Sequence, residues 1–158
     1  MPIFTSADPA IPVFPLDPGS ESVIAASGWM IRGVVGSAPF SYSIGLHSQG
    51  LPELILFGMS HENGMYLLHD VVDSLLSARK AGTEFRGKQI MEHWELPLFM
   101  LPVTQEQVKD YAVAAIDRSG GKATYIQVVL PDAAGVFSWE PGFNEKFRAK
   151  VNALSAPQ

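Results

Sequence analysis

The chain has 158 residues, of which 47% are hydrophobic and 17% are charged, with no cysteine and a formal net charge of −5. This length fits one domain with a substantial core, and the composition excludes intrinsic disorder as the main state. The acidic balance argues against a general nucleic-acid binder, because neutralising phosphates requires a basic surface. The lack of cysteine excludes a disulfide scaffold, a thiol nucleophile and zinc sites built on thiolates.

Neither a signal peptide nor a membrane segment is expected. A secretory signal begins with basic residues, but the first basic residue of this chain is Arg32. The most hydrophobic uncharged stretch, residues 96–103, contains two prolines and is far shorter than the ~20 residues that span a bilayer. We therefore expect a soluble, cytoplasmic protein with no membrane role.

The first 27 residues are rich in proline. Pro9, Pro12, Pro15 and Pro18 recur every three residues, which is the repeat of a polyproline II helix. The residues between them are mostly apolar, which is unusual for a solvated linker. The pattern predicts that residues 1–27 form an extended arm packed on its own domain or on a second copy of the chain, in preference to a docking peptide for a proline-binding domain.

Three antiparallel strands are predicted next, over residues 28–35, 40–47 and 53–57. The first two alternate between apolar and small or polar residues, whereas the third is almost continuously apolar, as expected for a strand covered on both faces. The second strand has the clearest alternation, and its small polar face consists of Ser41, Ser43, Gly45 and His47.

The rest of the chain predicts helices and further strands. Ser60 and Gly82 bound a helix with an apolar stripe, and Thr104 with Gln107 forms a capping box before a second stripe that ends at Gly120. Further strands are predicted within residues 83–93, 97–103, 123–130 and 136–139. Residues 28–158 are therefore expected to form a single α+β domain, with a mainly antiparallel sheet of about five to seven strands and two main helices packed on it.

Several of these segments together carry a resemblance to a known family. Residues 40–46 read Phe-Ser-Tyr-Ser-Ile-Gly-Leu and are followed by Pro-Glu-Leu at 52–54, and a Pro-Asp pair at 131–132 precedes Gly135 and Trp139. This pattern resembles the bacterial domain-of-unknown-function family 4262 (DUF4262). The resemblance implies a fold and the place of a site, but no activity.

No complete catalytic or cofactor motif is present. Residues 41–45 lack the first glycine of a nucleophile elbow and lie inside a predicted strand. Glycine-rich phosphate loops are absent, and His61-Glu62 has no second histidine four residues later, as a metalloprotease helix requires. The catalytic residues and the cofactor are therefore unknown, and no metal site is assigned.

The candidate ligand-binding residues are Tyr42, Ser43, His47, Glu53, Asp132 and Trp139. Glu53 begins an apolar strand, so a buried carboxylate there needs a partner such as Arg32 or backbone donors. The alternative for Glu53 and Asp132 is a structural role, because carboxylates near turns usually accept main-chain hydrogen bonds.

Two classes of function remain open. The charge-poor surface and the proline arm favour a small binding or interaction protein, such as an immunity-like or regulatory partner, or a self-associating homodimer. The alternative is a small enzyme, or a protein that binds a flavin-like cofactor or a metal, with its site over the strand face of Ser41, Ser43, Gly45 and His47. A homo-oligomer or a protein partner is expected, and a small-molecule ligand is the other possibility.

Overall fold

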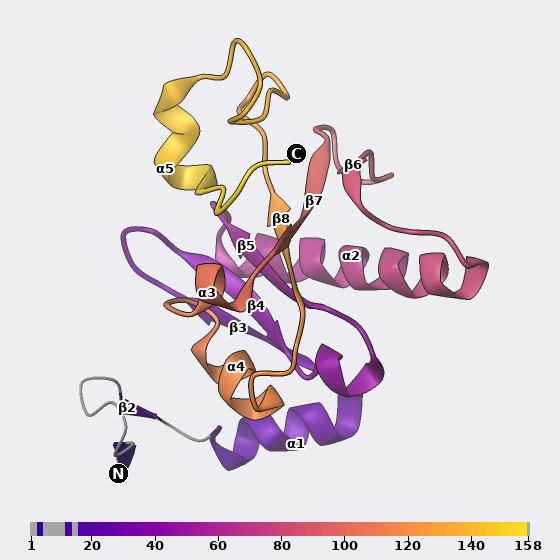
Figure 1. The fold of residues 1–158 in the computed structure, drawn as a ribbon, viewed down its shortest axis with the longest axis vertical. Helices are drawn as coiled ribbons and strands as arrows, with labels where there is room; N and C mark the ends of the chain where they lie inside the picture. The colour runs from indigo at the N-terminus through magenta and orange to yellow at the C-terminus, as the bar shows by residue number, and fades with distance from the viewer. Residues whose placement is uncertain (1–2, 5–11, 14–15, 158) are drawn as a thin grey trace.

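The computed structural model describes residues 3–4, 12–13 and 16–157, with a six-stranded sheet at the centre (Figure 1). Its strands are β3 (Met30–Val34), β4 (Phe40–Ile44), β5 (Glu53–Phe57), β6 (Gly87–Gln89), β7 (Leu98–Val103) and β8 (Tyr125–Val129). They lie in the order β3-β4-β5-β8-β7-β6. Neighbours are antiparallel, except that β5 and β8 run parallel. A separate two-stranded antiparallel sheet joins β1 (Ile3–Phe4) and β2 (Pro12–Val13).

Helices cover both faces of the main sheet. They are α1 (Pro18–Ser27), α2 (His61–Ala81), α3 (Gln105–Val108), α4 (Val113–Ser119) and α5 (Arg148–Val151), with two 3₁₀ helices, η1 (Leu46–Gln49) and η2 (Glu145–Phe147). The long α2 packs on one face, and α1, α3, α4 and the C-terminal segment pack on the other. The structure thus confirms a single α+β domain with a mainly antiparallel sheet.

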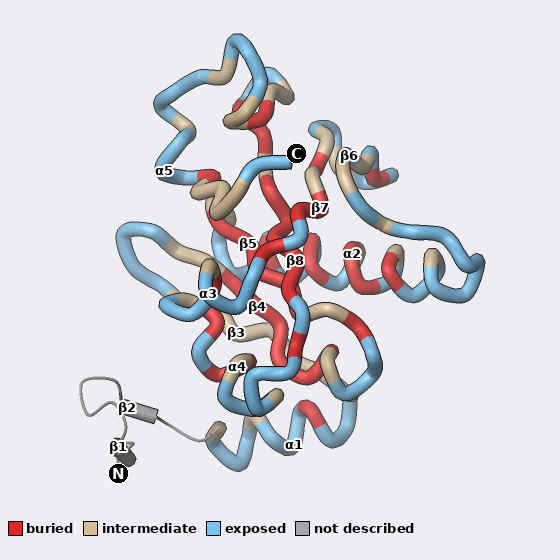
Figure 2. The backbone as a smooth tube through the Cα atoms, in the orientation of Figure 1, coloured by how far each residue is buried: buried red, intermediate tan, exposed pale blue. Residues whose placement is uncertain are grey.

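Strand β5 shows how the sequence builds the two cores. Its side chains alternate, so that Leu54 and Leu56 pack with α2, whereas Ile55 and Phe57 pack in the opposite core. All of its residues are buried, as the apolar run predicted. Figure 2 shows the buried residues concentrated along the central strands and on the sheet-facing side of α2.

Helix α2 has the predicted limits. The Ser60 side chain caps its start by accepting a hydrogen bond from the Asn63 amide, and Gly82 ends it in the left-handed region (φ 73°). Its apolar stripe, centred on Leu67, Leu68 and Val71, is fully buried against the sheet. Among the described residues, no helix is both long and apolar enough to cross a membrane.

Helix α1 corrects the prediction that residues 1–27 are extended throughout. Asp17 caps this helix, because its Oδ2 accepts a hydrogen bond from the Ser20 amide at 3.0 Å. Pro18 lies in the first turn, where its missing N–H has no helical partner to lose, and Gly28 ends the helix in the left-handed region. The last proline of the three-residue repeat therefore begins a helix.

The remainder of the predicted arm is described only in part. Residues 1–2, 5–11 and 14–15 lie outside the described residues. The division of the chain into an arm and a domain stays a prediction, as does the surface on which the arm packs.

Smaller differences concern four predicted elements. The strand over 40–47 ends at Ile44, where η1 follows, and only one strand, β6, forms within 83–93. The second helical stripe is divided into α3 and α4 by turns. Residues 136–139 form no strand, because the Asp132 side chain and carbonyl–amide bonds within the loop take the hydrogen bonds that a strand partner would make.

Candidate functional site

Glu53 lies at the amino end of β5 with only 2% of its surface exposed. Its Oε1 accepts hydrogen bonds from the Ser43 hydroxyl (2.8 Å) and the Leu46 amide (3.1 Å). Its Oε2 accepts from the amides of Gly45 (3.0 Å) and His47 (3.4 Å). The carboxylate therefore binds the N–H groups at the start of η1 that have no partner within the helix, as anions do at helix amino ends. Burial raises the pKa of Glu53 above its ordinary value, although each of these hydrogen bonds acts to lower it.

The contacts of Glu53 are all internal. Ser43 also accepts a hydrogen bond from the Leu54 amide (2.8 Å), so that its hydroxyl links β4 to β5. Arg32 is not the partner of Glu53, because its guanidinium lies 3.8 Å from Asp17. The partners of Glu53 are therefore mainly backbone donors, the second of the two kinds that the sequence suggested.

The small polar face of β4 is closed, which corrects the idea that a cofactor lies over it. Ser41 is 2% exposed and Ser43 is fully buried, because α2 packs directly on them. A Cβ atom on Gly64 of α2 would lie 3.1 Å from the Ser41 hydroxyl oxygen. The small residues therefore let α2 and the sheet approach closely and leave no space for a flat ligand. His47 belongs to η1 and not to β4.

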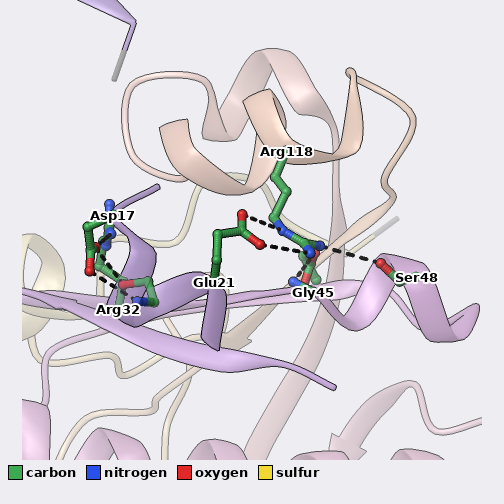
Figure 3. A network of polar contacts seen from close by, with 8 residues as sticks. Asp17, Glu21, Arg32, Gly45, Ser48 and Arg118 are labelled. Atoms are coloured by element: carbon green, nitrogen blue, oxygen red, sulfur yellow. Dashed lines mark hydrogen bonds and ion pairs between the residues drawn. The ribbon is translucent and has the colours of Figure 1, made fainter. Parts of the chain in front are cut away.

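Surface ion pairs complete this end of the sheet (Figure 3). Arg118 of α4 pairs with Glu21 of α1 (3.3 Å) and reaches the Ser48 hydroxyl of η1 (3.5 Å). Two helices are thereby joined to the connection that Glu53 holds.

Two aromatic candidates, Tyr42 and Trp139, belong to the core on the face of the sheet opposite α2. The Tyr42 hydroxyl is buried and accepts a hydrogen bond from the Ala114 amide (3.4 Å). Trp139 stacks on Phe137, with ring centroids 5.2 Å apart and planes 4° apart, and meets Phe99 edge to face. These contacts are those of a packed core, not of an open ligand site.

Asp132 follows β8 and is 2% exposed. Its Oδ1 accepts from the amides of Ala134 and Val136, and its Oδ2 accepts from the amide of Asn144, each at 2.9 Å. These main-chain donors hold the pKa of Asp132 below its ordinary value. The carboxylate thus ties two loops together, which is the structural role considered for it.

A cavity of about 520 Å³ lies at the carboxyl ends of β5 and β8, and we call it the β5–β8 cavity. It is lined by Gly58, Met59, His93, Trp94, Glu95, Leu96, Leu98, Leu130, Pro131, Asp132, Ala133, Phe147, Lys150 and Val151. Because β5 and β8 are parallel neighbours, their carboxyl ends meet at one edge of the sheet. Of the six candidates from the sequence, only Asp132 is among the lining residues.

The cavity combines an apolar interior with a polar mouth. Leu98 and Val151 are buried within it, whereas Glu95, Lys150 and Leu96 are exposed at the surface. The Trp94 ring is oriented by a hydrogen bond from its Nε1 to Asp70 (3.0 Å). No catalytic or cofactor motif marks this cavity, although the Pro-Asp pair at 131–132 of the family pattern lines it. The other signal is the pair of strand ends at Gly58 and Leu130, which lie together because β5 and β8 are parallel.

The C-terminal strap, residues 145–154, forms one wall of the cavity and is bound to the sheet by Gln127. This fully buried side chain donates to the carbonyls of Val151 (3.4 Å) and Asn152 (2.9 Å) and accepts from the Leu154 amide (2.8 Å). The Gln127 amide in the centre of β8 therefore helps to hold the wall, together with Gln107, whose Nε2 donates to the Leu154 carbonyl (3.2 Å).

The described part of the chain contains no group of three or more histidine, aspartate or glutamate side chains placed to hold a metal ion.

The comparisons with known proteins give one match. The model of the family described as "Domain of unknown function (DUF4262)" matches residues 23–144, which include all six strands of the main sheet. Comparisons with curated proteins and with solved structures give no match. The match covers well over half of the chain and confirms the resemblance seen in its motifs. The chain belongs to the DUF4262 family.

Proposed function

We propose that this chain is a binding protein for a small amphipathic molecule, which occupies the β5–β8 cavity. The observation that carries the proposal is the cavity itself. Its volume of about 520 Å³ lies within the ~300–1,000 Å³ typical of small-molecule sites, which are mostly apolar with a few polar groups. In open α/β sheets, ligands bind outside the carboxyl ends of the parallel strands, and this cavity lies at the carboxyl ends of the parallel pair β5 and β8.

The lining residues support an amphipathic ligand. Leu98, Leu130 and Val151 offer an apolar surface to the body of the molecule, while Glu95 and Lys150 at the mouth meet its polar end. Burial of an apolar chain contributes about 0.8 kcal/mol per methylene group. The cost of association offsets part of this gain, so we expect micromolar to millimolar dissociation constants for simple ligands.

The first experiment uses the neutral, apolar dye N-phenyl-1-naphthylamine, whose fluorescence rises in an apolar environment. We expect saturable binding to the wild-type chain and its loss in Leu130→Trp, because the indole ring fills the cavity. Circular dichroism and urea denaturation check that this variant is folded. If Leu130→Trp is folded and binds the dye as the wild type does, the ligand does not lie in this cavity.

A matched pair of milder variants gives an independent test. Leu96 at the mouth and Leu76 on α2 have almost equal exposure, at 38% and 37%, but only Leu96 lines the cavity. We expect Leu96→Ser to weaken dye binding about threefold, from lost apolar contact, and Leu76→Ser to leave it unchanged. Equal effects of the two substitutions would indicate adsorption of the dye to the general surface.

The expectation of a homodimer or of another protein partner stays a prediction. Sedimentation of the purified chain over a range of concentrations, with and without the dye, tests self-association separately from ligand binding.

A further inference from the structure

We infer that the ligand of the β5–β8 cavity is an anionic amphiphile, a carboxylate on an apolar body, whose charged group binds the Lys150 amine. This inference rests on the function proposed above and names the class of ligand that the same site selects.

Lys150 is fixed in the wall of the cavity by packing on both sides. A Cβ atom on Gly58 would lie only 2.9 Å from the Lys150 carbonyl oxygen and 3.2 Å from its Cγ, so the base of the side chain lies directly on the end of β5. The amine lies 5.9 Å from the ring centroid of Phe147, which also lines the cavity. Both contacts hold the lysine beside the apolar interior.

The amine of Lys150 has no carboxylate partner within the described residues. The neighbouring Arg148 differs, because its guanidinium is paired with Glu145. An unpaired cation held against apolar side chains is a suitable partner for an anion that brings its own apolar body.

The two acidic residues of the lining do not oppose this assignment. Asp132 already has both carboxylate oxygens occupied by three main-chain amides, which offset its charge locally. Glu95 and Lys150 are both exposed at the mouth, where water and salt screen their fields. Lys150 differs in that its stem packs on Gly58 and its amine lies near the Phe147 ring, so it is the unpaired charged side chain packed beside the apolar interior.

The test compares three probes that share one apolar chain and differ in charge: n-octanoate, n-octanol and n-octylammonium, measured by displacement of the neutral dye at pH 7 and low salt. In the wild type we expect octanoate to bind about fivefold more tightly than octanol, the scale of a partly exposed ion pair. Octylammonium is expected to bind more weakly than octanol. From hexanoate to decanoate, affinity should rise about fourfold per methylene.

Substitutions locate the charge effect. Lys150→Met is expected to remove the advantage of octanoate and to leave octanol binding within twofold, and Lys150→Glu to transfer the preference to octylammonium. Lys146→Met is the matched control, because this lysine lies in the same strap but does not line the cavity. It should change no affinity. Both Lys150 variants change an exposed residue, and urea denaturation verifies their folding.

The outcomes separate the two proposals. Equal wild-type affinity for octanoate and octanol, or an octanoate advantage that persists in Lys150→Met, overturns the inference while the cavity remains a ligand site. Tighter binding of octylammonium overturns it too and assigns the polar contact to Glu95. If none of the three probes displaces the dye and the dye itself does not bind, both proposals fail.

Discussion

The two ends of β5 differ in how the chain closes them. At the amino end, Glu53 accepts one hydrogen bond from β4 and three from the β4–β5 connection, and helices α1 and α4 are joined over that connection by Arg118. At the carboxyl end, Gly58 meets side chains that come from segments far away in the sequence, and a cavity remains between them. One end is a finished polar network and the other is an unfilled apolar space.

A buried carboxylate therefore does not by itself indicate a ligand-binding site in this fold. Glu53 and Asp132 are equally buried, one at each end of the parallel pair of strands, and both satisfy main-chain donors. Internal satisfaction of this kind stabilises a connection and leaves nothing for a ligand to bind. The end where the packing is incomplete is the one at which we propose that a ligand binds.

The largest expected effect is the loss of the Glu53 network. Glu53→Ala leaves the Ser43 hydroxyl and three main-chain amides buried without an acceptor, so we expect a decrease of about 3 kcal/mol in the free energy of unfolding at pH 7. Urea denaturation measures it. Glu106→Ala is the control, since its pair with Lys109 is exposed and contributes little to stability. A loss below about 1 kcal/mol for Glu53→Ala would mean that water replaces the carboxylate at little cost.

The second effect concerns the wall of the cavity. Gln127→Leu removes the amide that binds the C-terminal strap, leaving the carbonyl of Asn152 and the amide of Leu154 unpaired. We expect a decrease of about 2 kcal/mol in stability, together with faster hydrogen exchange in the strap and weaker dye binding. Exchange in η1, at the other end of the sheet, should not change. Faster exchange at both ends would show that the two ends are not independent.

The third effect compares two glycines with similar backbone conformations. Gly58 (φ 92°) lies against the strap, whereas Gly142 (φ 86°) has nothing within 4 Å of a Cβ position. Each alanine substitution costs about 1 kcal/mol for the left-handed conformation, so Gly142→Ala measures the backbone strain alone. Gly58→Ala should lose about 1–2 kcal/mol more, because the new methyl group displaces Lys150. It should also weaken octanoate binding, whereas Gly142→Ala should not.

Much of the fold could be predicted because its signals are local. Ser60 and Gly82 delimit α2 by capping chemistry, and the apolar run of β5 indicates a strand buried on both faces. Helix α1 also has local signals, namely Asp17 before Pro18 and a final Gly28. The three-residue proline repeat that overlaps them predicts an extended chain instead, which is why the helix was not predicted. The parallel pairing of β5 and β8 depends on strand order, which no local pattern contains.

The site was harder to predict for the same reason. The position of Glu53 at the start of an apolar strand correctly indicated a need for partners, but those partners are amides of a 3₁₀ helix whose place depends on the turn after β4. The cavity requires Gly58, Leu130 and Lys150 to meet, and none of them belongs to a catalytic or cofactor motif. Of the residues chosen for their chemistry, Ser43, His47 and Glu53 therefore lie at the closed end of the sheet, and only Asp132 lines the cavity.

The smallest expected effect, and the most direct test of the comparison, is the pH dependence of stability. Burial raises the pKa of Glu53 in the folded chain above 4.5, so the stability linked to its titration is fully present below pH 4.5 and decreases as the pH rises through the folded-state pKa, while the hydrogen bonds of the ionised carboxylate remain. Main-chain hydrogen bonds lower the pKa of Asp132 below 3.8, so its contribution is present above pH 3.8 and is lost as the pH falls.

The two isosteric variants Glu53→Gln and Asp132→Asn cannot titrate at these positions, and each serves as the control for the other. The stability advantage of the wild type over Glu53→Gln should shrink as the pH rises above 4.5, and its advantage over Asp132→Asn should shrink as the pH falls below 3.8. Urea midpoints measured from pH 3 to 7 give both curves. Slopes of the same sign would show that the two buried carboxylates have equivalent environments. Opposite slopes require that burial dominates the pKa of Glu53 and that main-chain hydrogen bonds dominate the pKa of Asp132.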